Sequence, residues 1–305
     1  MNPLRFTDYL VIVGYLLMLV GLGFYFRKRA SKSLEDYFLG GKRLPWWAMG
    51  ISGMASCTDM AGTMLIVSFL YMLGPRGLYV EFRGGAVLIL AFMMICTGKW
   101  HYRSRCMTGA EWMEYRFGLN WGGKFARLIS AIAVITTTIG MLAYMIKALG
   151  MFVSMFLPFS PVTCAFVMIG VATLYTLVSG FYGVVFTDLF QSCIVVSAIV
   201  LVTVLAAGHI TDAQSFGAHA TRVTGDSHWM ESMLPWRADM PRGYEAYQNL
   251  GLLAFFYFAR NAFIGMSSAG ADPRYFGARS ERECGSMTFF WITLMMLRWP
   301  MMIGL

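Results

Sequence analysis

Eight apolar segments, most of them long enough to cross a bilayer, are spread along this chain of 305 residues. About 20 apolar residues span the hydrocarbon core as one helix, and a helix satisfies its backbone hydrogen bonds without water. Only 13% of the residues are charged, whereas a soluble domain has about 25%. We therefore expect one all-α polytopic membrane domain over residues 1–305, with spans at 8–26, 45–73, 84–100, 126–157, 161–180, 184–208, 247–271 and 286–305.

The segments between these spans differ in their positive charge. Loops 27–44, 99–127 and 272–284 contain six, six and three of the 24 Lys and Arg residues, whereas loops 74–83 and 209–245 contain two and three. The positive-inside rule then predicts that loop 27–44 faces the cytoplasm and the N-terminus faces outward. The net charge of +8 follows from this topology, so we expect no nucleic-acid partner.

Three further expectations concern the longest loop, the C-terminal end and the location of the predicted domain. The long polar segment 209–245 predicts an extracytoplasmic loop with a short surface helix or lid. The chain stops at Leu305 inside an apolar run without a polar flank, which predicts a domain that is incomplete at its C-terminus. Spans of this kind indicate a multi-pass protein of the cell membrane, either a plasma membrane or a bacterial inner membrane.

An acidic residue lies deep inside the second apolar segment. Asp59 comes about three helical turns into 45–73, with Gly53 and Gly62 on either side. A charged side chain at the bilayer centre costs ~2.5–3.5 kcal/mol on insertion scales, so such residues are usually functional. Small residues around it allow the helix to unwind and to present backbone carbonyl groups to an ion. The segment is therefore typical of a cation-coupled transporter.

Signatures of other function classes are missing from the sequence. There is no HExxH, GxSxG or Walker motif, and no GxGxxG between a strand and a helix. The four histidines lack metal-ligand spacing, and the six cysteines form no CxxC pair. We therefore expect no enzyme, no disulfide framework and no cofactor.

Five segments resemble the sodium:solute symporter family and occur in the order that the family has. Together they extend over roughly residues 35–290, and five matches in register are far more specific than any one of them. The TDMAG segment is most similar to the proline and pantothenate permease branch, although Ala61 stands where that branch has serine. The segments are DYFLGGKRLPWW at 36–47, TDMAG at 58–62, TGAEWMEYRFG at 108–118, SGFYGVVFTDLFQ at 179–191 and ADPRYFGARSERE at 271–283.

This resemblance implies a LeuT-type core of two inverted five-helix repeats, preceded by an extra N-terminal helix at 8–26. The spans from 45–73 to 184–208 would form the first repeat, and those at 247–271 and 286–305 would begin the second. Relatives have several more helices, so the resemblance also implies a C-terminally truncated chain. One of those later helices supplies the hydroxyl groups that complete the family's sodium site.

The resemblance also implies a sodium site at the interrupted second span. The carbonyl groups of Ala55 and Thr58 fall at the family's sodium position, and the aspartate that matches Asp59 is tied to sodium use in the proline branch. Two alternatives remain open from the residues themselves. Asp59 could pair with an intramembrane arginine, and the hydroxyls of Ser56 and Thr58 could bond back to their own helix.

A solute would then bind close to Asp59, Ala61 and Gly62, opposite Asn261 of a second broken helix. Asn261 matches a polar substrate contact of sugar-carrying relatives. The neighbouring Arg260 has three possible roles: pairing with a carboxylate substrate, pairing with Asp59, or lying at a helix end with its charge in the interface.

Asp188 belongs to the motif Thr187-Asp188-Leu189-Phe190-Gln191 near the predicted start of a span. The family resemblance implies an acidic way-station on the sodium exit path. The alternative is a helix N-cap, in which Thr187 or Asp188 satisfies exposed amide groups.

Taken together, these features predict a sodium-coupled symporter that imports a small organic solute by alternating access. The solute would be an amino acid, an organic acid or a sugar, with Na⁺ as the coupling ion. Two alternatives remain: a membrane sensor or receptor built on a symporter-like domain, and a proton-coupled carrier in which Asp59 binds the proton.

Overall fold

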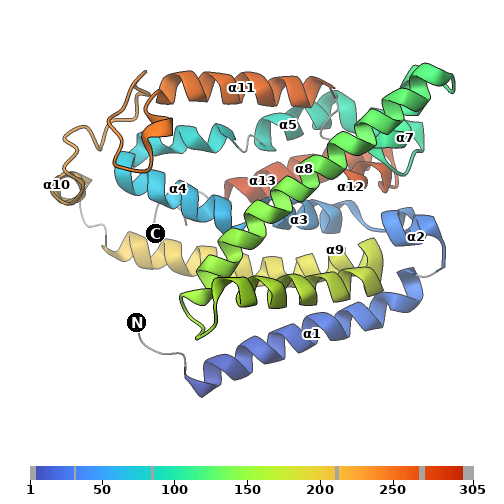
Figure 1. Ribbon diagram of the computed structural model, residues 1–305, viewed down its shortest axis with the longest axis horizontal. Helices are drawn as coiled ribbons and strands as arrows, with labels where there is room; N and C mark the ends of the chain where they lie inside the picture. The colour runs from blue at the N-terminus through green and yellow to red at the C-terminus, as the bar shows by residue number, and fades with distance from the viewer. Residues whose placement is uncertain (1–4, 31, 84–85, 210–212, 268–271, 298–305) are drawn as a thin grey trace. The chain divides into compact units, whose positions relative to one another are not determined.

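The computed structural model describes residues 5–30, 32–83, 86–209, 213–267 and 272–297. Every regular element in these ranges is a helix (Figure 1). The chain forms two compact units, each assembled from three segments that are distant in sequence. The first unit comprises residues 1–61, 98–192 and 271–291, and the second comprises residues 62–97, 193–270 and 292–305.

The first unit contains most of the long apolar helices. Side-chain caps define several helix starts: Thr108 Oγ1 accepts a hydrogen bond from the Glu111 amide at 3.2 Å, and Asn120 Oδ1 accepts one from the Gly123 amide at 3.0 Å. The elements wholly inside this unit are α1 (Phe6–Ala30), α2 (Leu34–Leu39), η1 (Gly40–Lys42), α3 (Trp46–Cys57), α6 (Gly98–Ser104), α7 (Gly109–Phe117), α8 (Trp121–Ser154) and α12 (Pro273–Phe276). Two more, α9 (Pro161–His209) and α13 (Glu281–Met296), begin in the first unit and end in the second.

The second unit has its own apolar core, in which Phe69, Leu73, Ala238 and Leu250 are buried. Helix α10 is the short helix expected within 209–245. The elements of this unit are most of α4 (Met60–Leu73), η2 (Gly74–Arg83), α5 (Ala86–Phe92), the π-helical η3 (Met93–Thr97), α10 (Ala213–Thr224), η4 (Glu245–Tyr247) and α11 (Leu250–Ser267).

The second predicted span is interrupted where the sequence predicted it. Pro45 precedes the first helical residue, Trp46, and α3 ends at Cys57. Thr58 has extended backbone angles (φ −102°, ψ 90°), and α4 begins at Met60. Segment 45–73 therefore consists of two helices separated at Thr58 and Asp59.

Helix α9 reverses direction at Gly180, where φ is 57° and ψ is −162° (Figure 1). These angles are accessible essentially to glycine alone. A Cβ atom at this position would also lie 2.8 Å from the carbonyl oxygen of Tyr37. The reversal divides α9 into two limbs, which correspond to the predicted spans 161–180 and 184–208.

Helix α1 packs along α9 within the first unit (Figure 1). The ring of Phe26 stacks on Phe186 with 4.6 Å between centroids, and the Gln191 amide donates a 2.9 Å hydrogen bond to the Tyr15 hydroxyl. These contacts anchor the limb of α9 that carries Asp188, because Phe186 and Gln191 lie on either side of it along the helix.

Four helical stretches in the described part of the chain are long and apolar enough to cross a membrane: Phe6–Lys28, Met60–Tyr79, Trp121–Ser154 and Pro161–Gly208. Leu250–Met266 is apolar but shorter. Of the remaining predicted spans, 84–100 corresponds to α5, η3 and α6, and 286–305 overlaps α13. Residues 84–85 and 298–305 lie outside the described ranges, and the total of eight spans stays a prediction.

Candidate functional site

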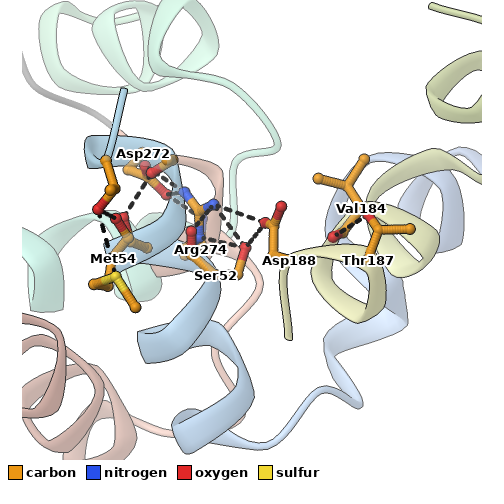
Figure 2. Close-up of polar contacts among 10 residues, drawn as sticks. Ser52, Met54, Val184, Thr187, Asp188, Asp272 and Arg274 are labelled. Carbon is orange, nitrogen blue, oxygen red and sulfur yellow. Dashed lines mark hydrogen bonds and ion pairs between the residues drawn. The ribbon is translucent and has the colours of Figure 1, made fainter. Parts of the chain in front are cut away.

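A buried ionic cluster joins three segments of the first unit that are far apart in sequence (Figure 2). It consists of Ser52 from α3, Asp188 from α9, and Asp272 with Arg274 at the start of α12. Ser52 is fully buried and Arg274 is only 7% exposed. A buried charge must be paired and hydrogen-bonded to be tolerated, so the cluster holds α3, α9 and α12 in one arrangement.

Ser52 connects the guanidinium group to the carboxylate of α9. Its Oγ donates a 2.5 Å hydrogen bond to Asp188 Oδ2 and accepts one from Arg274 Nη2 at 2.8 Å. The same Nη2 atom donates to the Ser52 carbonyl oxygen at 3.0 Å. The direct separation between Arg274 Nη2 and Asp188 Oδ2 is longer, at 3.9 Å. The serine hydroxyl thus mediates most of the contact between the two charged groups, as Figure 2 shows.

Asp272 fixes the direction of the Arg274 side chain. Its Oδ1 caps α12 by accepting a 2.8 Å hydrogen bond from the Arg274 amide, and its Oδ2 lies 2.9 Å from Arg274 Nη1. Pro273 occupies the first helical position, where its fixed φ favours helix initiation and its missing N–H is not needed. One carboxylate therefore starts the helix and orients the guanidinium group toward Ser52.

Trp291 covers the cluster from α13. Its ring centroid lies 5.5 Å from Arg274 Cζ, a cation–π arrangement. The ring packs on α3 at Gly53, where a Cβ atom would lie only 2.4 Å from Trp291 Cδ2. Helix α3 is regular at Gly53, and the missing side chain makes room for the indole. The predicted unwinding lies farther along, at Thr58 and Asp59.

The cluster has more negative than positive charge. It combines two carboxylates with one guanidinium group, and the side chains of Asp188, Asp272 and Arg274 are 15%, 21% and 8% exposed. In such a poorly hydrated place an excess negative charge is unfavourable unless a cation or a proton compensates it. Chemically, the arrangement can take up one cation or one proton beside Asp188.

The predicted ion-site residues lie at the end of α3. The Thr58 hydroxyl donates to the Met54 carbonyl oxygen at 3.0 Å, and the Ser56 hydroxyl donates to the Gly53 carbonyl oxygen at 2.7 Å. Both hydroxyls therefore bond back to their own helix, which was the alternative interpretation. The Ala55 carbonyl oxygen accepts the Thr58 amide at 3.1 Å. Each of these carbonyl oxygens has a second lone pair, so backbone oxygens are the ion ligands that this helix end offers.

Three further predicted residues follow directly along the chain. Asp59 lies in the link between α3 and α4, and Ala61 and Gly62 lie in the first turn of α4. Asp59 is partly buried and Ala61 is buried. Asp59 and Ala61 belong to the first unit and Gly62 to the second. Their roles in binding an ion or a solute stay predictions.

Arg260 and Asn261 belong to the second unit, in the middle of α11. Arg260 is exposed, whereas Asn261 is 1% exposed, and Arg260 Nη1 lies 3.4 Å from Asn261 Oδ1. Helix α11 is continuous from Leu250 through Ser267, and no proline interrupts it. Residues 268–271, which complete the predicted span 247–271, lie outside the described residues.

The N-cap interpretation of Asp188 was wrong. Helix α9 is regular on both sides of Asp188, since the chain reverses well before it, at Gly180. The Thr187 hydroxyl bonds back to the Val184 carbonyl oxygen at 2.9 Å, so it caps no helix end (Figure 2). Asp188 instead points at Ser52.

Sequence reasoning missed Ser52, Asp272 and Arg274 as site residues. Arg274 was counted among the cations of loop 272–284, yet it is one of the buried residues of the first unit. A signal was present, since Asp272 followed by Pro273 is typical of a helix start. That signal predicts the short helix α12, although it does not predict what the arginine on it contacts.

Comparison with known proteins identifies the family. The Sodium:solute symporter family model matches residues 37–297. The chain is 27% identical to the sodium/sialic acid symporter SiaT of Proteus mirabilis over 75% of this chain and 45% of that protein. It is 25% identical to the sodium/mannose cotransporter SLC5A10 of Bos taurus over 67% of this chain and 34% of that protein. The chain thus spans less than half the length of these two relatives.

A solved structure shows the same fold. It is the substrate-bound outward-open state of a Na⁺-coupled sialic acid symporter, with a TM-score of 0.73 and 21% identity over 98% of this chain and 60% of that chain. The fold is accordingly the LeuT-type fold of a multi-pass membrane protein, as predicted. The proposed closeness to the proline branch is not resolved by these relatives. The chain belongs to the sodium:solute symporter family, whose members are transporters and not enzymes.

Proposed function

We propose that the whole protein is a Na⁺-coupled symporter that imports a small organic solute by alternating access. The observation that supports this most is the interruption between α3 and α4 at Thr58 and Asp59, in a chain of this family. A helix interruption inside a membrane frees backbone carbonyl groups that can replace the water around an ion.

Sodium would bind at the carbonyl oxygens of Ala55 and Thr58, with Asp59 close by. Later helices that this chain does not contain would complete the shell of oxygen ligands. Asp188 would then hold the ion on its way to the cytoplasm. The excess negative charge around Asp188 supports this second role, because a passing cation would balance it.

The solute would contact Asp59, Ala61, Gly62, Arg260 and Asn261. Two of the relatives carry sialic acid and mannose, and of these sialic acid has a carboxylate. An arginine at membrane depth suits such a group through paired hydrogen bonds. We therefore favour a carboxylate-bearing solute, either an acidic sugar or another organic acid, over a neutral sugar.

The proposed orientation places the N-terminus outside and loop 27–44 in the cytoplasm, in a plasma or bacterial inner membrane. One Na⁺ moving inward across 100 mV supplies ~2.3 kcal/mol, and a tenfold Na⁺ gradient adds ~1.4 kcal/mol. Together they permit the accumulation of a solute by roughly several hundredfold.

The test uses the full-length protein reconstituted in proteoliposomes. Uptake of labelled sialic acid, mannose and proline would be measured with an inward Na⁺ gradient, with K⁺ in its place, and with a pH gradient alone. We expect Na⁺-driven uptake of a carboxylate solute. We also expect Asp59→Asn to weaken apparent Na⁺ affinity about tenfold or more, which corresponds to the loss of ~1.4 kcal/mol of ion binding.

Asp239→Asn is the matched control, because it removes the same charge from an exposed loop position. This control should leave Na⁺ dependence unchanged. Uptake driven by the pH gradient alone would favour the proton-coupled carrier, and an unchanged Na⁺ affinity in Asp59→Asn would remove Asp59 from the ion site.

A further inference from the structure

A polar cleft lies in the first unit, and none of the residues proposed for transport lines it. It has a volume of about 360 Å³ and is lined by Lys42, Arg103, Arg105 and Arg279, together with Tyr102 and Glu281. Each of the three loops that the sequence predicts to be cytoplasmic contributes at least one of these cations. The chain thus folds charges from three distant loops into a single cleft.

Two of the four cations are already compensated. Lys42 Nζ lies 3.1 Å from Glu35 Oε1, and Arg103 forms a two-pronged pair with Glu281 at 2.8 and 2.7 Å. Arg105 and Arg279 pair with no carboxylate in the part of the chain that the structure describes. Arg279 Nη2 donates a hydrogen bond to the Arg43 carbonyl oxygen, which leaves its charge uncompensated. Both guanidinium groups can therefore still attract an anion to the cleft.

The backbone around the cleft is strained. Among the described residues, Lys42 (φ 53°) and Arg105 (φ 56°) are the two non-glycine residues with positive φ, and both line this cleft. Long side chains adopt this region only at a cost. Such strain is concentrated at binding sites, where it persists because the surrounding structure enforces it. Here it turns two cationic side chains toward the same space.

An aromatic cavity adjoins the cleft and shares Arg103 with it. This cavity, of about 320 Å³, is lined by Trp100, Trp112, Tyr115 and Arg116 in addition to Arg103 and Ser104. Trp100 and Tyr115 are 44% and 64% exposed. Exposed Trp and Tyr side chains are typical of the membrane interface, where one part of the ring is apolar and the other is hydrated.

We propose that the cleft binds the phosphate group of an anionic phospholipid, with the aromatic cavity covering the adjoining glycerol and upper acyl region. Arg105 and Arg279 hold the phosphate oxygens, and the Tyr102 side chain lines the same cleft. Basic pockets next to membrane helices bind acidic lipid headgroups by the same chemistry. This site is independent of the transport site, and it faces the cytoplasmic leaflet in the proposed orientation.

The test is retention of lipid by the full-length protein in nanodiscs of phosphatidylcholine with a minor fraction of phosphatidylglycerol or phosphatidic acid. Native mass spectrometry would count the anionic lipids retained. Arg105→Gln and Arg279→Gln should each weaken retention roughly fivefold. The control is Arg282→Gln, which removes an exposed arginine from the same helix as Glu281 and lies outside the cleft.

Equal losses in the control and in the cleft variants would overturn the site, since they would show only general surface attraction. In a parallel measurement, millimolar inorganic phosphate would be added to protein in pure phosphatidylcholine. The readout is the temperature of thermal unfolding. If phosphate raised this temperature while no anionic lipid was selectively retained, the lipid proposal would be overturned and the ligand would be a soluble phosphate compound.

Arg105→Gly separates binding from folding. Glycine removes a cation and also relieves the strained φ, so thermal stability should stay equal or rise while lipid retention falls roughly fivefold. A variant that lost stability and kept its lipid would contradict the proposal that this strain serves binding.

Discussion

Trp291 lies directly on Gly53, so that a Cβ atom built on the glycine would be 2.4 Å from Cδ2 of the indole. The same indole faces Arg274 Cζ at 5.5 Å. The absence of a side chain at Gly53 therefore allows Trp291 to pack over the ionic cluster.

Replacing Gly53 by alanine should destabilise the protein by about 1–3 kcal/mol, because the added methyl group overpacks a buried contact. The measurement is thermal unfolding of the detergent-solubilised protein. Gly285→Ala is the matched control, since a Cβ atom there meets no atom of the described residues within 4 Å. It should be neutral or slightly stabilising. Equal losses in both variants would contradict the packing argument.

Arg274→Gln should be among the most damaging single changes in the first unit. Removing one partner from a buried ion pair costs about 3–5 kcal/mol, because the remaining charge is left uncompensated. Arg274→Lys keeps the charge but loses the fork that reaches Ser52 and Asp272 together, so its loss should be intermediate. Unfolding in mild detergent would measure both.

A second change distinguishes charge from packing in this cluster. Asp188→Asn in the Arg274→Gln background removes one of the two carboxylates that have lost their cation and should recover part of the lost stability. Full additivity of the two changes would show that the charges do not interact.

Acid should destabilise the protein through His101. This side chain is fully buried between Trp112 and Phe276, and neither ring nitrogen has a hydrogen-bond partner among the described residues. Burial lowers the pKa of His101 from 6.5 to about 4, against a smaller opposing effect of the Asp272 charge. The unfolded chain therefore takes up a proton between pH 6.5 and 4 while the folded protein does not.

Stability is thus fully present above pH 6.5 and falls as the pH approaches 4, by about 3 kcal/mol from this group. His101→Phe keeps a ring in the same space and removes the titration. The difference in melting temperature between the wild type and this variant, followed from pH 7.5 to pH 4, isolates the effect from that of the carboxylates. A difference that did not change with pH would contradict the assignment.

Arg260→Gln should discriminate between solutes. If Arg260 pairs with a substrate carboxylate, uptake of sialic acid should weaken about tenfold or more while uptake of a neutral sugar changes little. Arg260→Lys, which keeps a point charge, should retain part of the carboxylate preference. Equal losses for acidic and neutral solutes would mean that the arginine acts on the structure of α11, where it bonds to Asn261.

Several features of the fold could be predicted from local sequence. Apolar length identified the long helices, and the polar residues around Asp59 marked the interruption between α3 and α4. The glycine at position 180 coincided with the predicted boundary between two spans. Each of these depends on neighbours along the chain, which is the information that hydropathy and turn preference contain.

The ionic cluster could not be predicted in the same way. Ser52 and Arg274 are 222 residues apart, and nothing near either residue specifies the other. The sequence pattern offered Asp188 a place on the sodium exit path or a helix cap, and neither interpretation named Ser52 or Arg274 as a partner. Likewise, charge counting treated Arg274 as a loop cation, because counting records the number of charges and not their burial.

The long separation between Ser52 and Arg274 also matters while the protein is being made. At roughly 5–20 residues per second, a ribosome needs about 10–40 s to proceed from the serine to the arginine. By the end of that interval α3 and the Asp188 limb of α9 are already synthesised, and the carboxylate has no guanidinium partner until Arg274 is added. Closure of the first unit must therefore wait for α12, so a nascent chain arrested before residue 274 should be held as an open substrate for membrane chaperones and proteases.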